Sequence, residues 1–245
     1  GNPNPREGQV GSYTNAIKTS KYTWWNLIPK GTFEQFRRLA NVYFLAISVM
    51  MIIGTYVPNT WENSIQYITT LGPLIVIVSC TLVKEALEDL KRHHSDNEVN
   101  NRIASVLIQH GEFKEMEWCN LQPGMIVKVN DRDEIPADII PLVSSGEEGK
   151  CYIETANIDG ETNLKLRSCA PCGGEGLPGW EDASSLSSMT DISLEFEPPN
   201  PSIHTFAGNV KTPSGTAPVG SSEVLLRGAV LRNTKWILGA VVYTG

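Results

Sequence analysis

Two uncharged stretches dominate the hydrophobic pattern of this chain, and a short polar connection separates them. Charged residues are absent from Leu39 to Trp61 and again from Asn63 to Val83. About 20 apolar residues in a helix cross a hydrocarbon core of about 30 Å, and both stretches reach that length. We therefore predict two transmembrane helices, at about residues 39–58 and 64–83. The alternative is a pair of buried helices in a large soluble core.

Basic residues flank the outer ends of these two stretches, whereas the connection between them carries only Glu62. Cytosolic flanks are enriched in Lys and Arg, so both outer ends of the hairpin should face the cytosol. The chain is then a multi-pass integral membrane protein. The flanking residues are Lys18, Lys21, Lys30, Arg37 and Arg38 before the first stretch, and Lys84, Lys91 and Arg92 after the second.

Local signals refine the helical part. Thr32 and Gln35 have the spacing of a capping box, which predicts a helix along the membrane interface at residues 32–39. Pro73 should bend the second span, because its ring removes a backbone hydrogen bond. Helical spacing continues through Lys84–Arg92, which predicts a cytosolic stalk.

Beyond residue 100 the pattern changes to short strands and turns. The segments Ile103–Ile108 and Phe113–Trp118 flank His110-Gly111 and predict a β-hairpin. A segment rich in Gly, Ser and Pro predicts a flexible insertion at about residues 170–188. The fold class is therefore α+β, a helical hairpin plus a small, mainly β cytosolic domain. Further predicted strands are Met125–Val129, Ile139–Val143, Cys151–Glu154, Thr205–Lys211, Glu223–Leu226 and Trp236–Tyr243.

The net charge and the cysteines argue against a nucleic-acid partner, a disulfide framework and a metal site. The net charge of −7 argues against a nucleic-acid partner, since no dense basic stripe is available to neutralise phosphates. The 5 cysteines are scattered and odd in number, which favours reduced thiols. Cys169 and Cys172 form an isolated Cys-x-x-Cys pair, with His204 as the nearest additional ligand by sequence. Zinc requires four ligands or an open fourth position, so we expect no metal site.

Several segments, in one order along nearly the whole chain, resemble P-type ATPases and particularly their phospholipid-transporting type IV branch. They are Asn15-Ala16-Ile17, Glu34-Gln35-Phe36-Arg37-Arg38, Lys84-Glu85-Ala86, Pro136-Ala137-Asp138, Asp159-Gly160-Glu161-Thr162-Asn163-Leu164-Lys165, Leu225-Leu226-Arg227-Gly228 and Tyr243-Thr244-Gly245.

The resemblance implies a division of the chain into three parts of the P-type ATPase fold. Residues 1–31 would form a cytosolic N-terminal segment of the actuator and stalk. Residues 32–92 would contain the interfacial helix, transmembrane helices 1 and 2 and a stalk. Residues 93–245 would form the actuator domain, which promotes dephosphorylation in this family.

The resemblance also implies that Asp159–Thr162 is the catalytic loop. Glu161 would be the base that directs water onto an aspartyl phosphate, because a carboxylate can orient water and accept its proton. Gly160 would let the backbone approach the phosphoryl group, and Thr162 would offer a hydroxyl. On local sequence alone, the alternative is an Asp-Gly surface turn. Asp138 should cap backbone groups, while Lys165 should pair with a neighbouring domain or remain solvated.

The function that this resemblance implies is ATP-driven translocation of a phospholipid from the exoplasmic or lumenal leaflet to the cytosolic leaflet. It implies ATP and Mg²⁺ bound outside this chain, a two-span glycosylated accessory β-subunit, and residence in the plasma membrane or in Golgi or endosomal membranes. The chain contains no Asp-Lys-Thr-Gly phosphorylation motif. We therefore expect it to be inert alone and to need the rest of the ATPase chain.

One departure from the family bears on the lipid. Many members that move phosphatidylserine carry two Gln residues midway along the first span, where Met51 and Ile52 stand here. These apolar side chains are our substrate-path candidates, and they argue against a serine-lipid preference through that gate. Two other functions remain open: a regulatory ATPase-like membrane module fused to another enzyme, and a cation-transporting P-type ATPase.

Overall fold

The structure is a computed structural model, and it describes residues 14–57, 66–108, 112–171, 192–198, 205–212 and 215–244. The chain divides into two compact units. One comprises Lys18–Glu98, and the other comprises Gly1–Ile17 together with Val99–Gly245. We call the first the helical unit and the second the β unit, after the elements that they contain.

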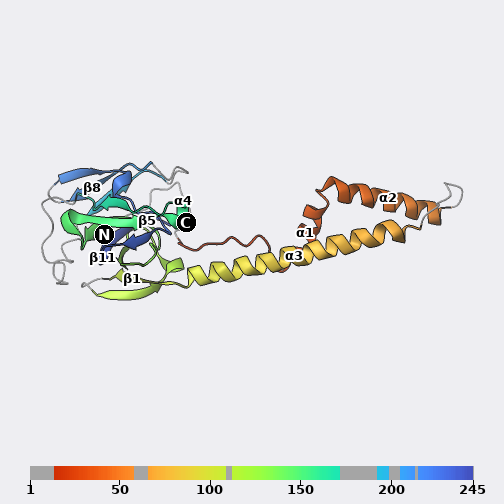
Figure 1. Cartoon of the computed structure of the whole chain (residues 1–245), viewed down its shortest axis with the longest axis horizontal. Helices are drawn as coiled ribbons and strands as arrows, with labels where there is room; N and C mark the ends of the chain where they lie inside the picture. Colours follow the sequence, from red (N-terminus) through yellow and green to blue (C-terminus); the bar gives the residue numbers. More distant parts are fainter. Residues whose placement is uncertain are drawn as a thin grey trace. The chain divides into compact units, whose positions relative to one another are not determined.

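Two long apolar helices, α2 (Leu39–Tyr56) and α3 (Ile68–Asn100), form an antiparallel hairpin in the helical unit (Figure 1). Both are long and apolar enough to cross a membrane, and only 6% of the most apolar window of each is buried. So large an exposed apolar surface is unfavourable in water but suits a hydrocarbon environment. The prediction of two long apolar helices is confirmed. The predicted ends at Pro58 and Ser64 lie outside the described residues.

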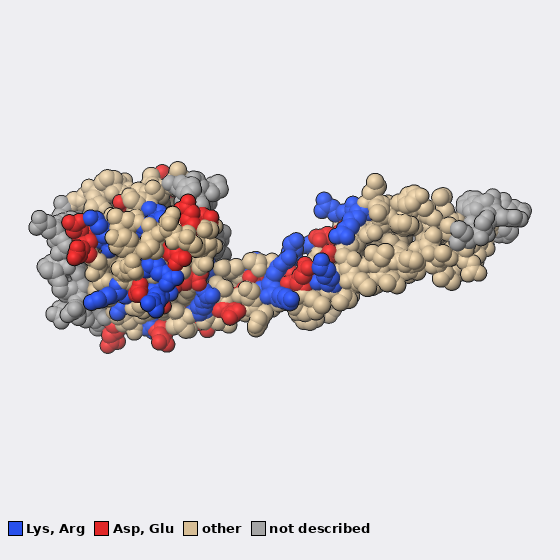
Figure 2. Space-filling view, viewed as in Figure 1, with Lys and Arg blue, Asp and Glu red and all other residues tan. Residues whose placement is uncertain are grey.

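Charged side chains of the helical unit gather where α1 (Leu27–Gln35) lies beside α3, whereas the visible surface of the hairpin beyond this region is uncharged (Figure 2). A polar contact lies inside that uncharged part. Ser48 of α2 is fully buried; its Oγ donates to the Phe44 carbonyl at 2.7 Å and lies 3.1 Å from Thr70 Oγ1 of α3. Such hydroxyl pairs satisfy one another where no water is available. Pro73 lies within α3, which continues on both sides of it.

The predicted capping box at Thr32 is wrong. Helix α1 begins at Leu27, so Thr32 lies inside it, and the N-cap residue Asn26 makes no side-chain capping hydrogen bond. Pro29 explains the earlier start, because proline is tolerated in the first helical turn, where backbone N–H groups have no partner. Gln35 is used differently: its Nε2 donates to Glu85 Oε1 of α3 at 2.7 Å.

Two buried carboxylates of α3 hold the segment Lys18–Tyr22, which we call the strap, by its backbone. Asp96 accepts hydrogen bonds from the backbone N–H of Thr19 at 2.8 Å, from that of the next residue at 3.2 Å, and from the Thr19 hydroxyl at 2.6 Å. Asp89 accepts from the last two N–H groups of the strap, at 2.7 and 3.2 Å. Residues seven apart lie on one helical face, so a single face of α3 holds the strap from Thr19 to Tyr22.

The β unit contains three antiparallel sheets among its described residues, with strand orders β2-β1-β3-β11-β4, β10-β5-β6 and β7-β8-β9. Buried Val127, Ile139, Ile153 and Leu231 belong to one core cluster, which joins the first two sheets. The strands are β1 (Ile103–Leu107), β2 (Phe113–Glu117), β3 (Ile126–Asn130), β4 (Asp138–Ser144), β5 (Lys150–Glu154), β6 (Lys165–Ser168), β7 (Ser193–Phe196), β8 (Gly208–Thr212), β9 (Gly215–Val219), β10 (Val230–Arg232) and β11 (Trp236–Tyr243).

Most of the predicted strands are confirmed, including the two strands of the β1–β2 hairpin. The predicted α+β fold class is confirmed as well. The strand predicted at Glu223–Leu226 is wrong, because a 3-10 turn occupies Ser221–Glu223 and Leu225 makes only an isolated bridge to Ile139. Val224 and Leu225 are buried without entering a sheet. The prediction missed β6, β7, β9 and β10, which are short or carry few apolar residues.

The flexible insertion predicted at about residues 170–188 falls mostly outside the described residues. Its predicted first residue is not part of a flexible surface segment. Ala170 is buried, and its backbone N–H donates to the Pro141 carbonyl at 2.8 Å. Cys172 and His204 also lie outside the described residues.

Candidate functional site

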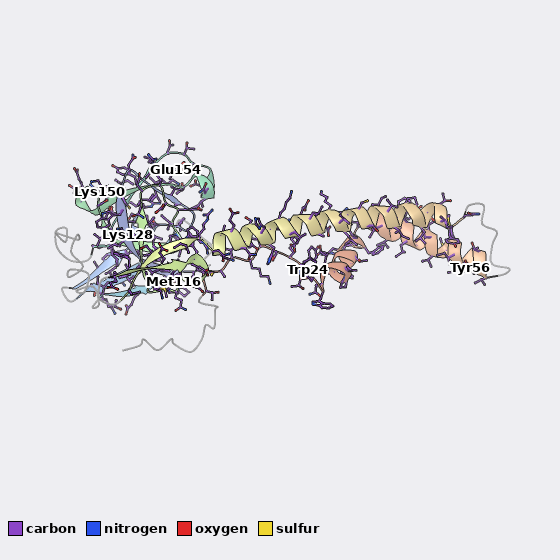
Figure 3. The ribbon with its side chains drawn as sticks, turned by 90° about the horizontal axis from the view of Figure 1, so that it is seen from below. Trp24, Tyr56, Met116, Lys128, Lys150 and Glu154 are labelled. Carbon is purple, nitrogen blue, oxygen red and sulfur yellow. The ribbon has the colours of Figure 1, made fainter. Side chains whose placement is uncertain are left out.

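The predicted catalytic loop connects two paired strands of the β unit. β5 and β6 are antiparallel, with Ile153 opposite Lys165. The inward residues of β5, Cys151 and Ile153, are buried in the core, and burial raises the pKa of the Cys151 thiol to about 11. Lys150 and Glu154, the two ends of β5, are labelled in Figure 3, and the chain enters the loop after Glu154. The sheet therefore supplies a fixed base for the loop.

A single helical turn, α4 (Ala156–Asp159), leads into the loop and ends at a glycine. Gly160 has a φ of +77°, and its N–H donates to the Ala156 carbonyl at 3.1 Å. Glycine adopts this left-handed conformation without the steric cost that other residues bear. A Cβ at this position would meet no atom within 4 Å. The backbone at Gly160 is therefore open to the approach of another group.

Asp159 organises the loop by accepting several hydrogen bonds. The Thr155 hydroxyl lies 2.9 and 3.0 Å from its two oxygens, the Glu161 backbone N–H donates at 2.9 Å, and Lys165 Nζ donates at 2.6 Å. The Lys165 ammonium and the Glu161 N–H favour the ionised carboxylate and lower the pKa of Asp159 to about 2. Asp159 is therefore a charged structural anchor at neutral pH.

The predicted base, Glu161, projects from this anchored turn. Its side chain is 59% exposed, and its Oε2 lies 2.9 Å from Lys165 Nζ. Thr162, the last predicted residue of the loop, is exposed as well. The turn thus brings Asp159, Gly160, Glu161 and Thr162 together on a solvent-accessible edge, where a carboxylate can reach a water molecule or an incoming group. The role of each in catalysis stays a prediction.

Lys165 behaves differently from the expectation that it would pair with a neighbouring domain or remain solvated. Its side chain is 27% exposed and forms ion pairs with both Asp159 and Glu161. These two carboxylates raise the pKa of the Lys165 ammonium, so it stays charged. Sequence reasoning missed this role and that of the buried Thr155, although each stands four residues from a loop carboxylate.

Three segments that carried the family resemblance meet elsewhere in the β unit. Asn15 is fully buried, and its Nδ2 donates to the carbonyls of Trp118 and Pro136, each at 2.9 Å. The Arg227 guanidinium donates to Asn15 Oδ1 at 2.8 Å, and the Arg227 backbone N–H donates to Asp138 Oδ1 at 2.8 Å. The predicted backbone-capping role of Asp138 is confirmed. Burial raises the pKa of this carboxyl.

The substrate-path candidates Met51 and Ile52 lie on α2 in the helical unit, and both are partly buried. The Thr70 hydroxyl of α3 lies 3.5 Å from Met51 Sδ, a weak hydrogen-bond acceptor. The Met51 side chain can therefore accept a weak hydrogen bond, although the sequence indicated that it could not. A role in the lipid path stays a prediction for both residues.

Comparisons with known proteins point to one family. Residues 2–65 match the family model described as phospholipid-translocating ATPase N-terminal. The chain is 42% identical to mouse phospholipid-transporting ATPase FetA, over 94% of this chain and 19% of that protein. It is 39% identical to human phospholipid-transporting ATPase ID, over 95% of this chain and 18% of that protein. It is 38% identical to Saccharomyces cerevisiae phospholipid-transporting ATPase DRS2, over 94% of this chain and 16% of that protein. The chain thus spans less than a fifth of these relatives.

Proposed function

This chain belongs to the type IV P-type ATPases, the phospholipid-transporting branch, and from this membership we propose that it supplies two functional parts of an ATP-driven phospholipid translocase. These parts are the first two membrane spans, within α2 and α3, and the domain that promotes dephosphorylation, the β unit. The observation that carries the proposal is the loop Asp159–Thr162, which presents an exposed glutamate from an anchored turn beside an open glycine.

In this proposal, Glu161 orients the water that attacks an aspartyl phosphate on another domain of the complete protein and accepts its proton. Asp159 fixes the turn through the Thr155 hydroxyl and the Glu161 N–H. Gly160 leaves room for the phosphoryl group, because a side chain there would project into the open approach. Thr162 adds a hydroxyl that can donate to a phosphate oxygen.

ATP and Mg²⁺ would bind to parts of the protein beyond this chain. Among the described residues, no group of three or more His, Cys, Asp and Glu side chains is placed to hold a metal ion. The proposed complete protein also includes the phosphorylated aspartate and the remaining spans, and it associates with a two-span glycosylated accessory β-subunit.

The substrate would move from the exoplasmic or lumenal leaflet to the cytosolic one, with both ends of the hairpin in the cytosol. Side chains just before α1 support a membrane interface at this end of the hairpin. Trp24 and Trp25 are 85% and 91% exposed, and Trp24 points away from α3 (Figure 3). Indole rings favour the membrane interface, and basic residues favour its cytosolic side. The membrane would be the plasma membrane or that of the Golgi or endosomes.

The test is a vanadate-sensitive ATPase assay on the complete protein, reconstituted with its accessory subunit in vesicles of defined phospholipids. We expect a lipid to stimulate the wild type and Glu161→Gln to abolish that stimulation, because the amide cannot accept a proton. Glu147→Gln, which alters an exposed glutamate of the same unit, is the matched control and should behave as wild type. Full lipid stimulation of Glu161→Gln would refute the assignment.

The same assay separates the two alternatives. A cation pump would respond to a cation rather than to a lipid, and a regulatory module would show no ATP turnover that depends on Glu161.

A further inference from the structure

Lys165 is the link between the two carboxylates of the loop. Its Nζ lies 2.6 Å from Asp159 Oδ2 and 2.9 Å from Glu161 Oε2, and its side chain is 27% exposed. One ammonium has three donors, so it can serve both carboxylates at once. Lys165 opens β6, whose pairing with β5 places its backbone. The backbone of Lys165 is therefore fixed by the sheet, and its side chain reaches both carboxylates from there.

The two carboxylates depend on Lys165 to different degrees. Asp159 also accepts hydrogen bonds from the Thr155 hydroxyl and the Glu161 backbone N–H, so it keeps two partners if Lys165 is removed. The Glu161 side chain extends into solvent, 59% exposed, and among the described residues Lys165 is the cation that pairs with it. Removing the ammonium would therefore leave Asp159 in place and free Glu161 to change rotamer.

We propose that Lys165 is a positioning residue that fixes the Glu161 carboxylate by tying it to Asp159. The inference rests on the proposed function, in which Glu161 orients the attacking water. The ion pair between Lys165 and the exposed Glu161 contributes little to the free energy of folding. Its effect is on geometry, because a carboxylate already held in its working rotamer loses less entropy when the reaction begins.

The experiment follows the decay of phosphoenzyme in the complete protein after a chase with unlabelled ATP. Lys165→Met should slow decay by about 10- to 100-fold, the effect of a misplaced catalytic group. The rate of phosphoenzyme formation should stay at its wild-type value, and the melting temperature should fall only slightly, because the ion pair with Asp159 is lost as well. Lys165→Arg should recover most of the decay rate, because a guanidinium can still bridge two carboxylates.

A matched control removes a different lysine from the same sheet. Lys150 stands at the start of β5 and pairs with Glu148 in an exposed position. Lys150→Met makes the same chemical change without touching the loop, so it should decay as wild type. Slowing in this variant equal to that in Lys165→Met would indicate a general effect of lost charge and would overturn the inference.

A double variant tests whether Lys165 acts through Glu161. When Glu161 is already Gln, Lys165→Met should slow decay no further, since the group that it positions is gone. Wild-type decay in Lys165→Met, or a full additional slowing in the double variant, would overturn the inference while leaving the role of Glu161 intact. Wild-type decay in Glu161→Gln alone would instead refute the proposed function.

Discussion

The strap offers a prediction whose size can be worked from the structure. Asp96 is 6% exposed and accepts three hydrogen bonds from two adjacent residues of the strap. Hydrogen bonds to a charged group contribute about 1.5–3 kcal/mol each. In Asp96→Ala, water can reach the freed donors because Thr19 is exposed, which offsets much of that sum. We expect the strap to become about 2–4 kcal/mol easier to open.

Hydrogen–deuterium exchange of the complete protein in lipid nanodiscs measures this opening directly. A change of about 2–4 kcal/mol corresponds to roughly 30- to 1000-fold faster exchange at the amides of Thr19 and Ser20. Glu98→Ala is the matched control, because Glu98 is exposed and stands on the same helix. Exchange at both amides that stays within a factor of about three of wild type would show that Asp96 does not hold the strap.

Three further predictions concern the β unit of the complete protein. Gly160→Ala puts a side chain at a φ of +77°, which costs about 1–2 kcal/mol; phosphoenzyme should decay more slowly, and an unchanged rate would contradict this. Gly239→Val would place a Cβ 2.8 Å from Ile139 Cδ1, so overpacking should lower stability by about 1–3 kcal/mol in thermal unfolding, and unaltered unfolding would show that the core can yield. Asp159 has its pKa lowered from 3.8 to about 2, so its stabilisation is complete above pH 4 and is lost as the pH falls toward 2; the gap in acid unfolding between wild type and Asp159→Asn should close over that range, and a gap independent of pH would refute the assignment.

Elements with a local hydrophobic pattern could be predicted from the sequence. Uncharged runs long enough for a bilayer predicted α2 and α3, and alternation around His110-Gly111 predicted the β1–β2 hairpin. The strand predicted at Trp236–Tyr243 agrees with β11 at both ends, because its six inner residues are apolar or glycine and are buried between two neighbouring strands. In each case neighbouring residues carry the signal.

Contacts between distant residues were not readable in the same way. The hydrogen bonds from the strap to Asp96 join residues 76 or 77 positions apart, and the bond from Asn15 to Pro136 joins residues 121 positions apart. A carboxylate in a charged helix has the same local pattern whether it is solvated or holds a second segment. The capping box failed for a related reason, since Gln35 found a partner on α3 that local spacing could not reveal.

The loop was recognised through family resemblance, whereas its internal organisation required the structure. Asp159-Gly160-Glu161-Thr162 could equally have been a surface turn on local sequence. Lys165 was expected to pair with a neighbouring domain or to remain solvated, because its spacing from the loop does not by itself show that the turn at Gly160 brings both carboxylates within reach.

The central claim is that Glu161 promotes hydrolysis of the aspartyl phosphate and that the transported lipid accelerates this hydrolysis. The most direct measurement is the decay of isotopically labelled phosphoenzyme in the complete reconstituted protein, with and without the transported lipid. The account predicts that lipid accelerates decay in the wild type and that Glu161→Gln accumulates phosphoenzyme that lipid cannot discharge. Rapid lipid-stimulated decay in Glu161→Gln would contradict it.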